Sequence, residues 1–127
     1  MKGWCLLIED DQTDVFICKK TVSLIQPGVV IKQVSSGVSA LSLLKELKEK
    51  SFPSTIIVDL VLPMMDGFAF LDIYQQEYFP YYPETRLFVL SSSVHTSDRL
   101  KSESYACVEA YFSKPMTPSV LESIDLK

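Results

Sequence analysis

The 127-residue sequence predicts an α/β fold, with a doubly wound, five-stranded parallel sheet covered by helices on both faces. Two observations predict this fold. Five short apolar segments alternate with segments in which apolar residues recur at helical spacing. The apolar segments are also nearly continuous, as expected of parallel strands that are buried on both faces. Because the length is that of one domain, we expect residues 1–127 to form a single domain with no output domain.

The first half of the chain holds three expected strands and two expected helices. The strands are the apolar runs at residues 4–8, 29–34 and 55–58. The first helix ends at Pro27-Gly28, and its apolar residues are Val15, Cys18, Val22 and Ile25. The second follows a polar start signal at residues 35–37, and its apolar residues are Ala40, Leu41, Leu44 and Leu47.

The second half holds three more helices and two more strands. The third helix opens at an Asp66-Gly67 turn, and its apolar residues are Phe70, Leu71 and Tyr74. The last two strands are the apolar runs at residues 86–90 and 108–112. A fourth helix at 97–106 is expected to pack weakly, because Leu100 is nearly its only aliphatic residue. The fifth helix begins with Thr117 as N-cap and Pro118 at the first helical position, a favoured pair.

Acidic residues follow directly after two of the expected strands. Glu9 and Asp10 follow the first strand, and Asp59 follows the third. In open α/β sheets, ligands bind at this end of the strands. Carboxylates held together in a partly dry site destabilise one another unless a cation neutralises them. Because the donors are all oxygen atoms, the expected cation is a hard divalent ion such as Mg²⁺.

Four motifs, in this order, resemble those of a response regulator receiver domain. They are Glu9-Asp10, Asp59-x-x-x-Pro63-x-x-Asp66-Gly67, Ser91-Ser92 and Lys114-Pro115. The resemblance extends from about residue 4 to about residue 124 and each motif lies at an expected strand end. It implies the strand order 2-1-3-4-5 of a flavodoxin-like (CheY-like) three-layer sandwich. Strands 1 and 3 are then neighbours, so the three carboxylates would meet.

The resemblance also implies the chemistry of the site. Asp59 would be the nucleophile that accepts a phosphoryl group from a phosphohistidine, on a sensor histidine kinase or a phosphotransfer protein. Asp10 would bind Mg²⁺ directly and Glu9 through a water molecule. Asp59 itself and the backbone carbonyl of Val61 would complete the protein ligands. Lys114 would bring a positive charge to the phosphoryl oxygens and to the Asp59 carboxylate.

Two further residues match the parts that transmit the signal in this family. Ser91 would hydrogen-bond the phosphoryl group, and Tyr111 would be the aromatic residue whose ring turns inward when that hydroxyl moves. Strand alternation is expected to place Tyr111 on the opposite face from Val108, Ala110 and Phe112. The peptide bond between Lys114 and Pro115 is expected to be cis, as in the family.

Other polar residues near the motifs have ordinary structural interpretations. Asp11 is expected to be a loop residue or a helix cap, and His95 a surface residue. Ser92 and Ser93 are expected in a loop, with Ser93 near the mouth of the site. The three cysteines have no C-x-x-C spacing and are expected to be small buried hydrophobic residues: Cys5, Cys18 and Cys107.

Composition limits the kinds of partner and the cell compartment that we expect for this protein. The net charge of −4 argues against general nucleic-acid binding, and no apolar run is long enough to cross a bilayer. Without a signal-peptide pattern, and with unpaired cysteines, the expected location is the cytoplasm. The receiver resemblance implies a downstream protein partner on the face formed by the fourth helix, fifth strand and fifth helix, and leaves a weak dimer open.

Two alternatives are weighed against a phosphorylated signalling module. A haloacid-dehalogenase-type phosphohydrolase also uses a strand-end Asp and Mg²⁺, but needs a second Asp two residues later, where this chain has Val61. A receiver-like interaction module that is never phosphorylated typically lacks an acidic residue, the acceptor or the lysine, and all are present here. We therefore expect a phosphorylated signalling module and not an enzyme with steady turnover.

Overall fold

The computed structural model describes residues 3–126, so the chain ends at 1–2 and 127, part of the expected single domain, lie outside the described residues. The strands are β1 Trp4–Ile8, β2 Val30–Val34, β3 Thr55–Val58, β4 Arg86–Ser91 and β5 Val108–Ser113. The helices are α1 Gln12–Ile25, α2 Gly37–Glu46, α3 Gly67–Glu77, α4 Thr96–Glu103 and α5 Pro118–Ile124, with a 3₁₀ turn, η1, at Glu49–Ser51.

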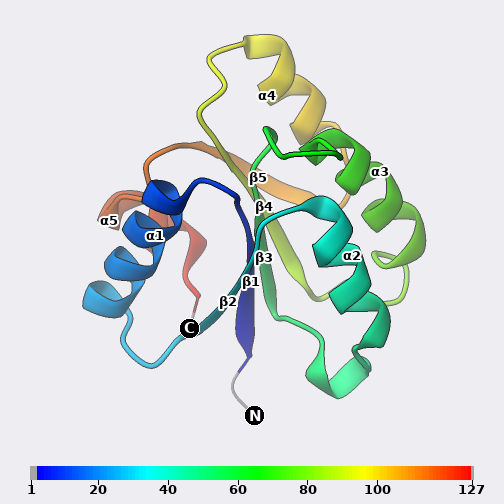
Figure 1. Cartoon of the computed structure of the whole chain (residues 1–127), viewed down its shortest axis with the longest axis horizontal. Helices are drawn as coiled ribbons and strands as arrows, with labels where there is room; N and C mark the ends of the chain where they lie inside the picture. The colour runs from blue at the N-terminus through cyan, green and yellow to red at the C-terminus, as the bar shows by residue number, and fades with distance from the viewer. Residues whose placement is uncertain (1–2, 127) are drawn as a thin grey trace.

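The strands form one parallel sheet in the order β2-β1-β3-β4-β5. Helices α1 and α5 cover one face of this sheet, and α2, α3 and α4 lie on the other (Figure 1). The molecule is therefore a three-layer α/β sandwich. The predicted fold class and the predicted strand order are both confirmed.

The inner strands divide their side chains between two hydrophobic cores. Leu6 and Ile8 of β1 pack toward α2 and α3, whereas Cys5 and Leu7 pack toward α1 and α5. All four residues of β3 are buried, which explains its unbroken apolar sequence. Each fully buried aliphatic side chain stabilises the fold by about 1.5–3 kcal/mol. The two cores hold the sheet rigid, and the functional residues follow its strand ends.

Three helices begin at side-chain caps: Thr117 was predicted as one, Asp11 as a loop residue or a cap, and Asp66 as part of a turn. The Asp11 side chain accepts a hydrogen bond from the Asp14 backbone N–H (3.0 Å) and so caps α1. Asp66 caps α3 through the N–H of Ala69 (2.8 Å). Thr117 caps α5 through the N–H of residue 120 (3.1 Å), with Pro118 as the first helical residue.

Two helices on the second face differ from their expected extent. Helix α2 ends at Glu46, so Leu47 lies just beyond it in extended conformation, although it still packs against the core. Helix α4 covers 96–103 and not 97–106, and Leu100 is 63% exposed. The buried residue of α4 is the small Ser102. Leu100 therefore does not attach α4 to the sheet, and the expected weak packing of this helix stays a prediction.

A bulge in β5 changes which residues share a face. Leu87 of β4 pairs with Val108, but the next residue of β4 pairs with Ala110, which leaves residue 109 as an extra residue in β5. Val108 and Tyr111 therefore pack into the same core, while Ala110 and Phe112 pack against the other. The prediction that Val108 lies opposite Tyr111 is wrong, because simple alternation does not anticipate the bulge.

Two expectations drawn from composition can be compared with the fold. The three cysteines are free and buried, as predicted. Burial raises the pKa of each thiol, so the thiols are protonated at neutral pH and are poor nucleophiles. Within residues 3–126, none of the helices combines the length and the apolar character that crossing a bilayer requires.

Replacing Gly67 with alanine is expected to destabilise the protein by about 2–3 kcal/mol. A Cβ at Gly67 would lie 2.5 Å from the Asp59 carbonyl oxygen and 2.6 Å from the Leu60 Cα, both backbone atoms that have no room to move. Gly37→Ala is the matched control, because there a Cβ first meets the flexible end of the Met65 side chain at 3.0 Å. Urea unfolding measures both. Equal losses in the free energy of unfolding for the two variants would contradict the importance of this close approach.

Candidate functional site

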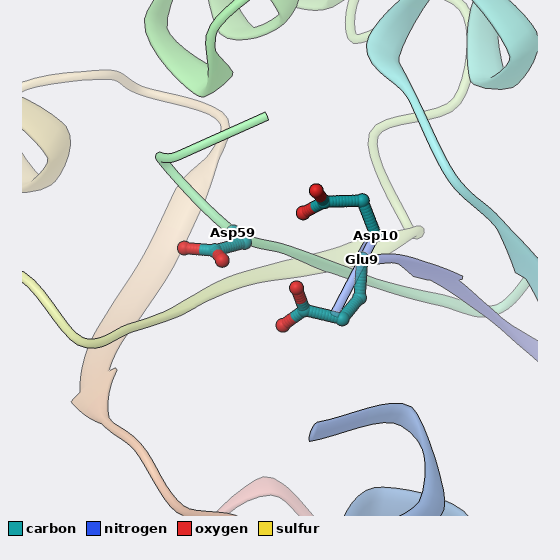
Figure 2. A group of neighbouring side chains, drawn as sticks. All are labelled: Glu9, Asp10 and Asp59. Carbon is teal, nitrogen blue, oxygen red and sulfur yellow. The ribbon is translucent and has the colours of Figure 1, made fainter. Parts of the chain in front are cut away.

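Three carboxylates lie together at the carboxyl ends of β1 and β3. Ile8 is level with Val58 in the paired strands, so Glu9 and Asp59 leave the sheet side by side. Carboxylate oxygens of Glu9, Asp10 and Asp59 all lie within 4.8 Å of one another (Figure 2). Glu9 and Asp59 are 3% and 4% exposed, and Asp10 is exposed. The predicted convergence of these residues is present.

Backbone hydrogen bonds hold the two strand ends in place. The Asp59 N–H donates to the Ile8 carbonyl (3.1 Å), and the Glu9 N–H donates to the Val34 carbonyl (3.0 Å). The Glu9 carboxylate accepts from the Asp11 N–H (3.2 Å), and the Asp59 carboxylate accepts from the Val61 N–H (3.2 Å). Val61 is thus held beside Asp59 with its side chain exposed, while a ligand role for its carbonyl stays a prediction.

Lys114 contributes one ammonium group to the carboxylate cluster. Its Nζ lies 2.7 Å from Asp59 Oδ2, 2.5 Å from Glu9 Oε1 and 2.8 Å from Asp14 Oδ2. The lysine backbone N–H also donates to the carbonyl of Ser91 (3.0 Å), and the peptide bond before Pro115 is cis, as the family resemblance implies. The predicted contact between Lys114 and Asp59 is present.

The contact from Asp14 was not predicted. Asp14 lies in the first turn of α1, one turn before the buried Cys18, on the side of the helix that faces the sheet. The signal was therefore available: an acidic residue four positions before a buried one, at the helix end nearest the strand ends. The apolar spacing that predicts this helix gives no role to its acidic residues.

The charges of the site are unbalanced. Three carboxylates contact the Lys114 ammonium, those of Glu9, Asp14 and Asp59, and the Asp10 carboxylate lies near two of them. Burial raises the pKa of Glu9 to about 7; the hydrogen bond from Lys114 opposes this effect, and the nearby charge of Asp59 adds to it. Burial alone would lower the pKa of the Lys114 ammonium, but its three carboxylate partners outweigh burial and raise it. A divalent cation would relieve the excess negative charge.

Ser91 and Tyr111 are joined through Ser93, beside a pocket of about 450 Å³ between the β4–α4 loop and β5. The Ser93 N–H donates to Ser91 Oγ (3.3 Å), and the Tyr111 hydroxyl donates to the Ser93 carbonyl (3.0 Å). The Ser93 hydroxyl donates to Asp98 of α4 (2.6 Å). Ser93 is a loop residue, as predicted, and its hydrogen bonds also join three elements, β4, β5 and α4. His95 is exposed, as predicted.

Tyr111 already packs inward in this structure. Its side chain belongs to a hydrophobic core and the residue is 7% exposed, while the guanidinium of Arg99 lies 5.8 Å from the ring centre. Ser91, at the end of β4, is fully buried. The Tyr111 ring could therefore turn inward only slightly more on signalling. The role of Ser91 in triggering that movement stays a prediction.

Comparisons with known proteins agree on one family. A family model described as the response regulator receiver domain matches residues 5–124. The chain is 28% identical over 120 residues to the sensor histidine kinase CheAY of Helicobacter pylori, a match that covers 94% of this chain and 14% of the kinase's length.

Solved structures are similar over nearly the whole fold. A two-component response regulator from Cytophaga hutchinsonii is 30% identical, with a TM-score of 0.88 and coverage of 98% of this chain and 95% of that one. The phosphorylated cyanobacterial phytochrome response regulator RcpA is 26% identical, with a TM-score of 0.78 and coverage of 98% and 89%. Given the sheet order, the acidic strand ends and the match over residues 5–124, this chain belongs to the response regulator receiver domains of two-component systems.

Proposed function

We propose that this protein accepts a phosphoryl group on Asp59, from a histidine kinase or a phosphotransfer protein, with Mg²⁺ as its cofactor. The convergence of Glu9, Asp10 and Asp59 with the Lys114 ammonium carries this proposal. The similar RcpA structure, which is described as phosphorylated, supports it. We further propose that the chain works as a single receiver domain, in the cytoplasm, and passes its signal to a protein partner.

The residues at the site fit Mg²⁺ because they offer oxygen donors and excess negative charge. Asp10 and Asp59 would hold the ion directly, Glu9 through a water molecule and Val61 through its carbonyl oxygen. When bound, the ion neutralises the charge on the phosphoryl oxygens. The side chains of Glu9 and Asp59 are fixed by backbone donors, so little reorganisation is required of them.

The chain's own residues account for the transfer step. A carboxylate oxygen of Asp59 attacks the phosphorus of a phosphohistidine, the P–N bond breaks, and the imidazole leaves with the bonding electrons and takes up a proton. Lys114 donates hydrogen bonds to the phosphoryl oxygens, and the Ser91 hydroxyl donates one more. Val61 has no group to transfer a proton to a leaving group, so turnover of phosphate esters should be negligible.

The direct test is labelling with a small-molecule donor. Incubation with Mg²⁺ and acetyl phosphate should add the mass of one phosphoryl group to the intact protein, and fragmentation should locate it on Asp59. Removal of Mg²⁺ with a chelator should prevent the addition. The proposal fails if no phosphoryl group is added. Steady hydrolysis of a phosphate ester by the same sample would favour a phosphohydrolase instead.

Mg²⁺ affinity should fall as the pH falls through about 7, because Glu9 has a raised pKa and is protonated below that value. A raised carboxyl pKa also means that Glu9 stabilises the metal-free fold below about pH 4.5, and that this contribution is lost as the pH rises to about 7. The increase in melting temperature caused by Mg²⁺ should therefore be larger at pH 8 than at pH 5.5. Equal increases would contradict the role of Glu9.

The signal should leave the site through Ser91 and Ser93. With beryllofluoride as a phosphoryl mimic, amide hydrogen exchange should change across α4, β5 and α5. In Ser91→Ala, the changes should stay within the loops around Glu9 and Asp59. Ser92→Ala is the matched control, because Ser92 is exposed and follows the switch residue directly. Changes in the wild-type protein that never reach residues 97–124 would contradict this route.

A further inference from the structure

Lys114 has three carboxylate partners, but the proposed chemistry engages two of them. Asp59 accepts the phosphoryl group, and both Asp59 and Glu9 are candidate metal ligands. The third partner, Asp14, belongs to α1 and lies 2.8 Å from the ammonium nitrogen. A lysine ammonium has three N–H donors and no acceptor, so each carboxylate can take one donor. Asp14 is thus the partner that neither the metal ion nor the phosphoryl group recruits.

The position of Asp14 is fixed by the core beneath α1. Val15 and Cys18, one and four residues after it in the helix, are buried against the sheet, and the Asp14 N–H is held by the Asp11 cap. A second contact joins α1 to the segment that carries the lysine: the Thr21 hydroxyl donates to the Met116 carbonyl (3.1 Å). The helix therefore holds the Lys114 side chain through Asp14 and the following backbone through Thr21.

We propose that Asp14 is a positioning residue, which keeps the Lys114 ammonium directed into the site throughout the phosphorylation cycle. The inference rests on the proposed function. A lysine side chain is a flexible stem, and the direction of its ammonium is set by its partners. When the metal ion draws Glu9 and Asp59, and the phosphoryl group replaces the free Asp59 oxygen, Asp14 remains on the lysine. One donor stays anchored while the other two turn to the phosphoryl oxygens.

The charge of Asp14 and its position beside Lys114 predict opposite effects on the rate of phosphorylation when its side chain is removed. As a negative charge near the site, Asp14 repels an incoming phosphoryl group, so its removal alone would favour phosphorylation. As an anchor for Lys114, its removal would slow phosphorylation. The Asp14 side chain is 28% exposed, so solvent screens its charge, whereas the ammonium that it holds is 8% exposed. The anchoring effect should therefore be the larger.

The test measures phosphorylation rates of the full chain with Mg²⁺ and phosphoramidate, a donor that needs no protein docking on α1. Asp14→Ala should slow phosphorylation about tenfold, the equivalent of one charge-assisted hydrogen bond. In Asp14→Asn, the amide oxygen still accepts from Lys114, so the rate should stay within about threefold of wild type. Thr21→Val removes the other contact between α1 and the Lys114 segment but leaves all three partners of the ammonium in place, so it should slow phosphorylation much less than Asp14→Ala.

Three outcomes would overturn the inference: an unchanged or faster rate in Asp14→Ala, equal slowing in the alanine and asparagine variants, or equal slowing in Thr21→Val. A second readout does not depend on phosphorylation. The Lys114 ammonium should give a slowly exchanging ¹⁵N-detected NMR signal in wild type and Asp14→Asn, and lose it in Asp14→Ala. If wild type is never labelled, the proposed function fails, while this signal still decides whether Asp14 holds the lysine.

Discussion

Asp59→Asn should not be labelled by a phosphodonor at all, while its fold is kept. An amide oxygen does not carry the negative charge with which a carboxylate attacks phosphorus. The asparagine oxygen can still accept the Val61 N–H, and Lys114 keeps Glu9 and Asp14 as partners. One repelling carboxylate is lost together with one ammonium contact, so stability without metal should change by no more than about 1 kcal/mol.

Intact-mass spectra after incubation with acetyl phosphate and Mg²⁺ measure the labelling of this variant. Asp66→Asn is the matched control, since it makes the same chemical change seven residues further on at an exposed helix cap. Asparagine caps helices about as well as aspartate, so this control should fold and be labelled like wild type. Labelling of Asp59→Asn to the wild-type level would place the acceptor elsewhere.

Asp10→Ala should weaken Mg²⁺ binding by about 100-fold or more, because it removes a carboxylate that we propose coordinates the ion directly. Asp10 is exposed, and its neighbours in the cluster are two carboxylates that it repels. The metal-free protein should therefore be as stable as wild type, or more stable by up to about 1 kcal/mol. Calorimetric titration with Mg²⁺ and thermal unfolding with and without the ion measure both effects.

Asp11→Asn is the control for this loss of charge. It removes the adjacent negative charge but keeps an N-cap on α1, so Mg²⁺ binding should weaken only slightly. A marked loss of metal-free stability in Asp10→Ala would show that this residue is structural. Similar Mg²⁺ affinities in the two variants would show that Asp10 contributes only to the general negative charge of the site.

The sequence was sufficient for the elements that are marked by local pattern. The unbroken apolar run of β3 and the spaced apolar residues of α1 each match the pattern of buried residues within that segment. Glu9, Asp10, Asp59 and Lys114 could be identified because they directly follow such strands in a recognisable order. Local pattern and motif order together therefore predicted the fold and most of the candidate site.

What escaped prediction depends on contacts between distant segments. Asp14 meets Lys114 across 100 positions of sequence, so the pattern of α1 can place Asp14 near the strand ends but cannot identify its partner. The extra residue in β5 is defined by the pairing of that strand with β4, which the sequence of β5 does not show. Alternation alone therefore assigned Val108 to the wrong face of the sheet. The exposure of Leu100, at 63%, and the burial of the small Ser102 depend on how α4 lies against its neighbours, which the sequence of the helix does not show.

Under the proposed function, Ser93 should make the response of each molecule close to all-or-none. Because its N–H, carbonyl and hydroxyl bind Ser91, Tyr111 and Asp98 respectively, moving one partner disturbs the other two. A half-shifted arrangement would leave a partly buried polar group unpaired, at about 1–3 kcal/mol, and would be rarely occupied. A cell in which half of the molecules are phosphorylated would then contain two populations. The strength of its output would follow the number of switched molecules, because each molecule is either switched or not.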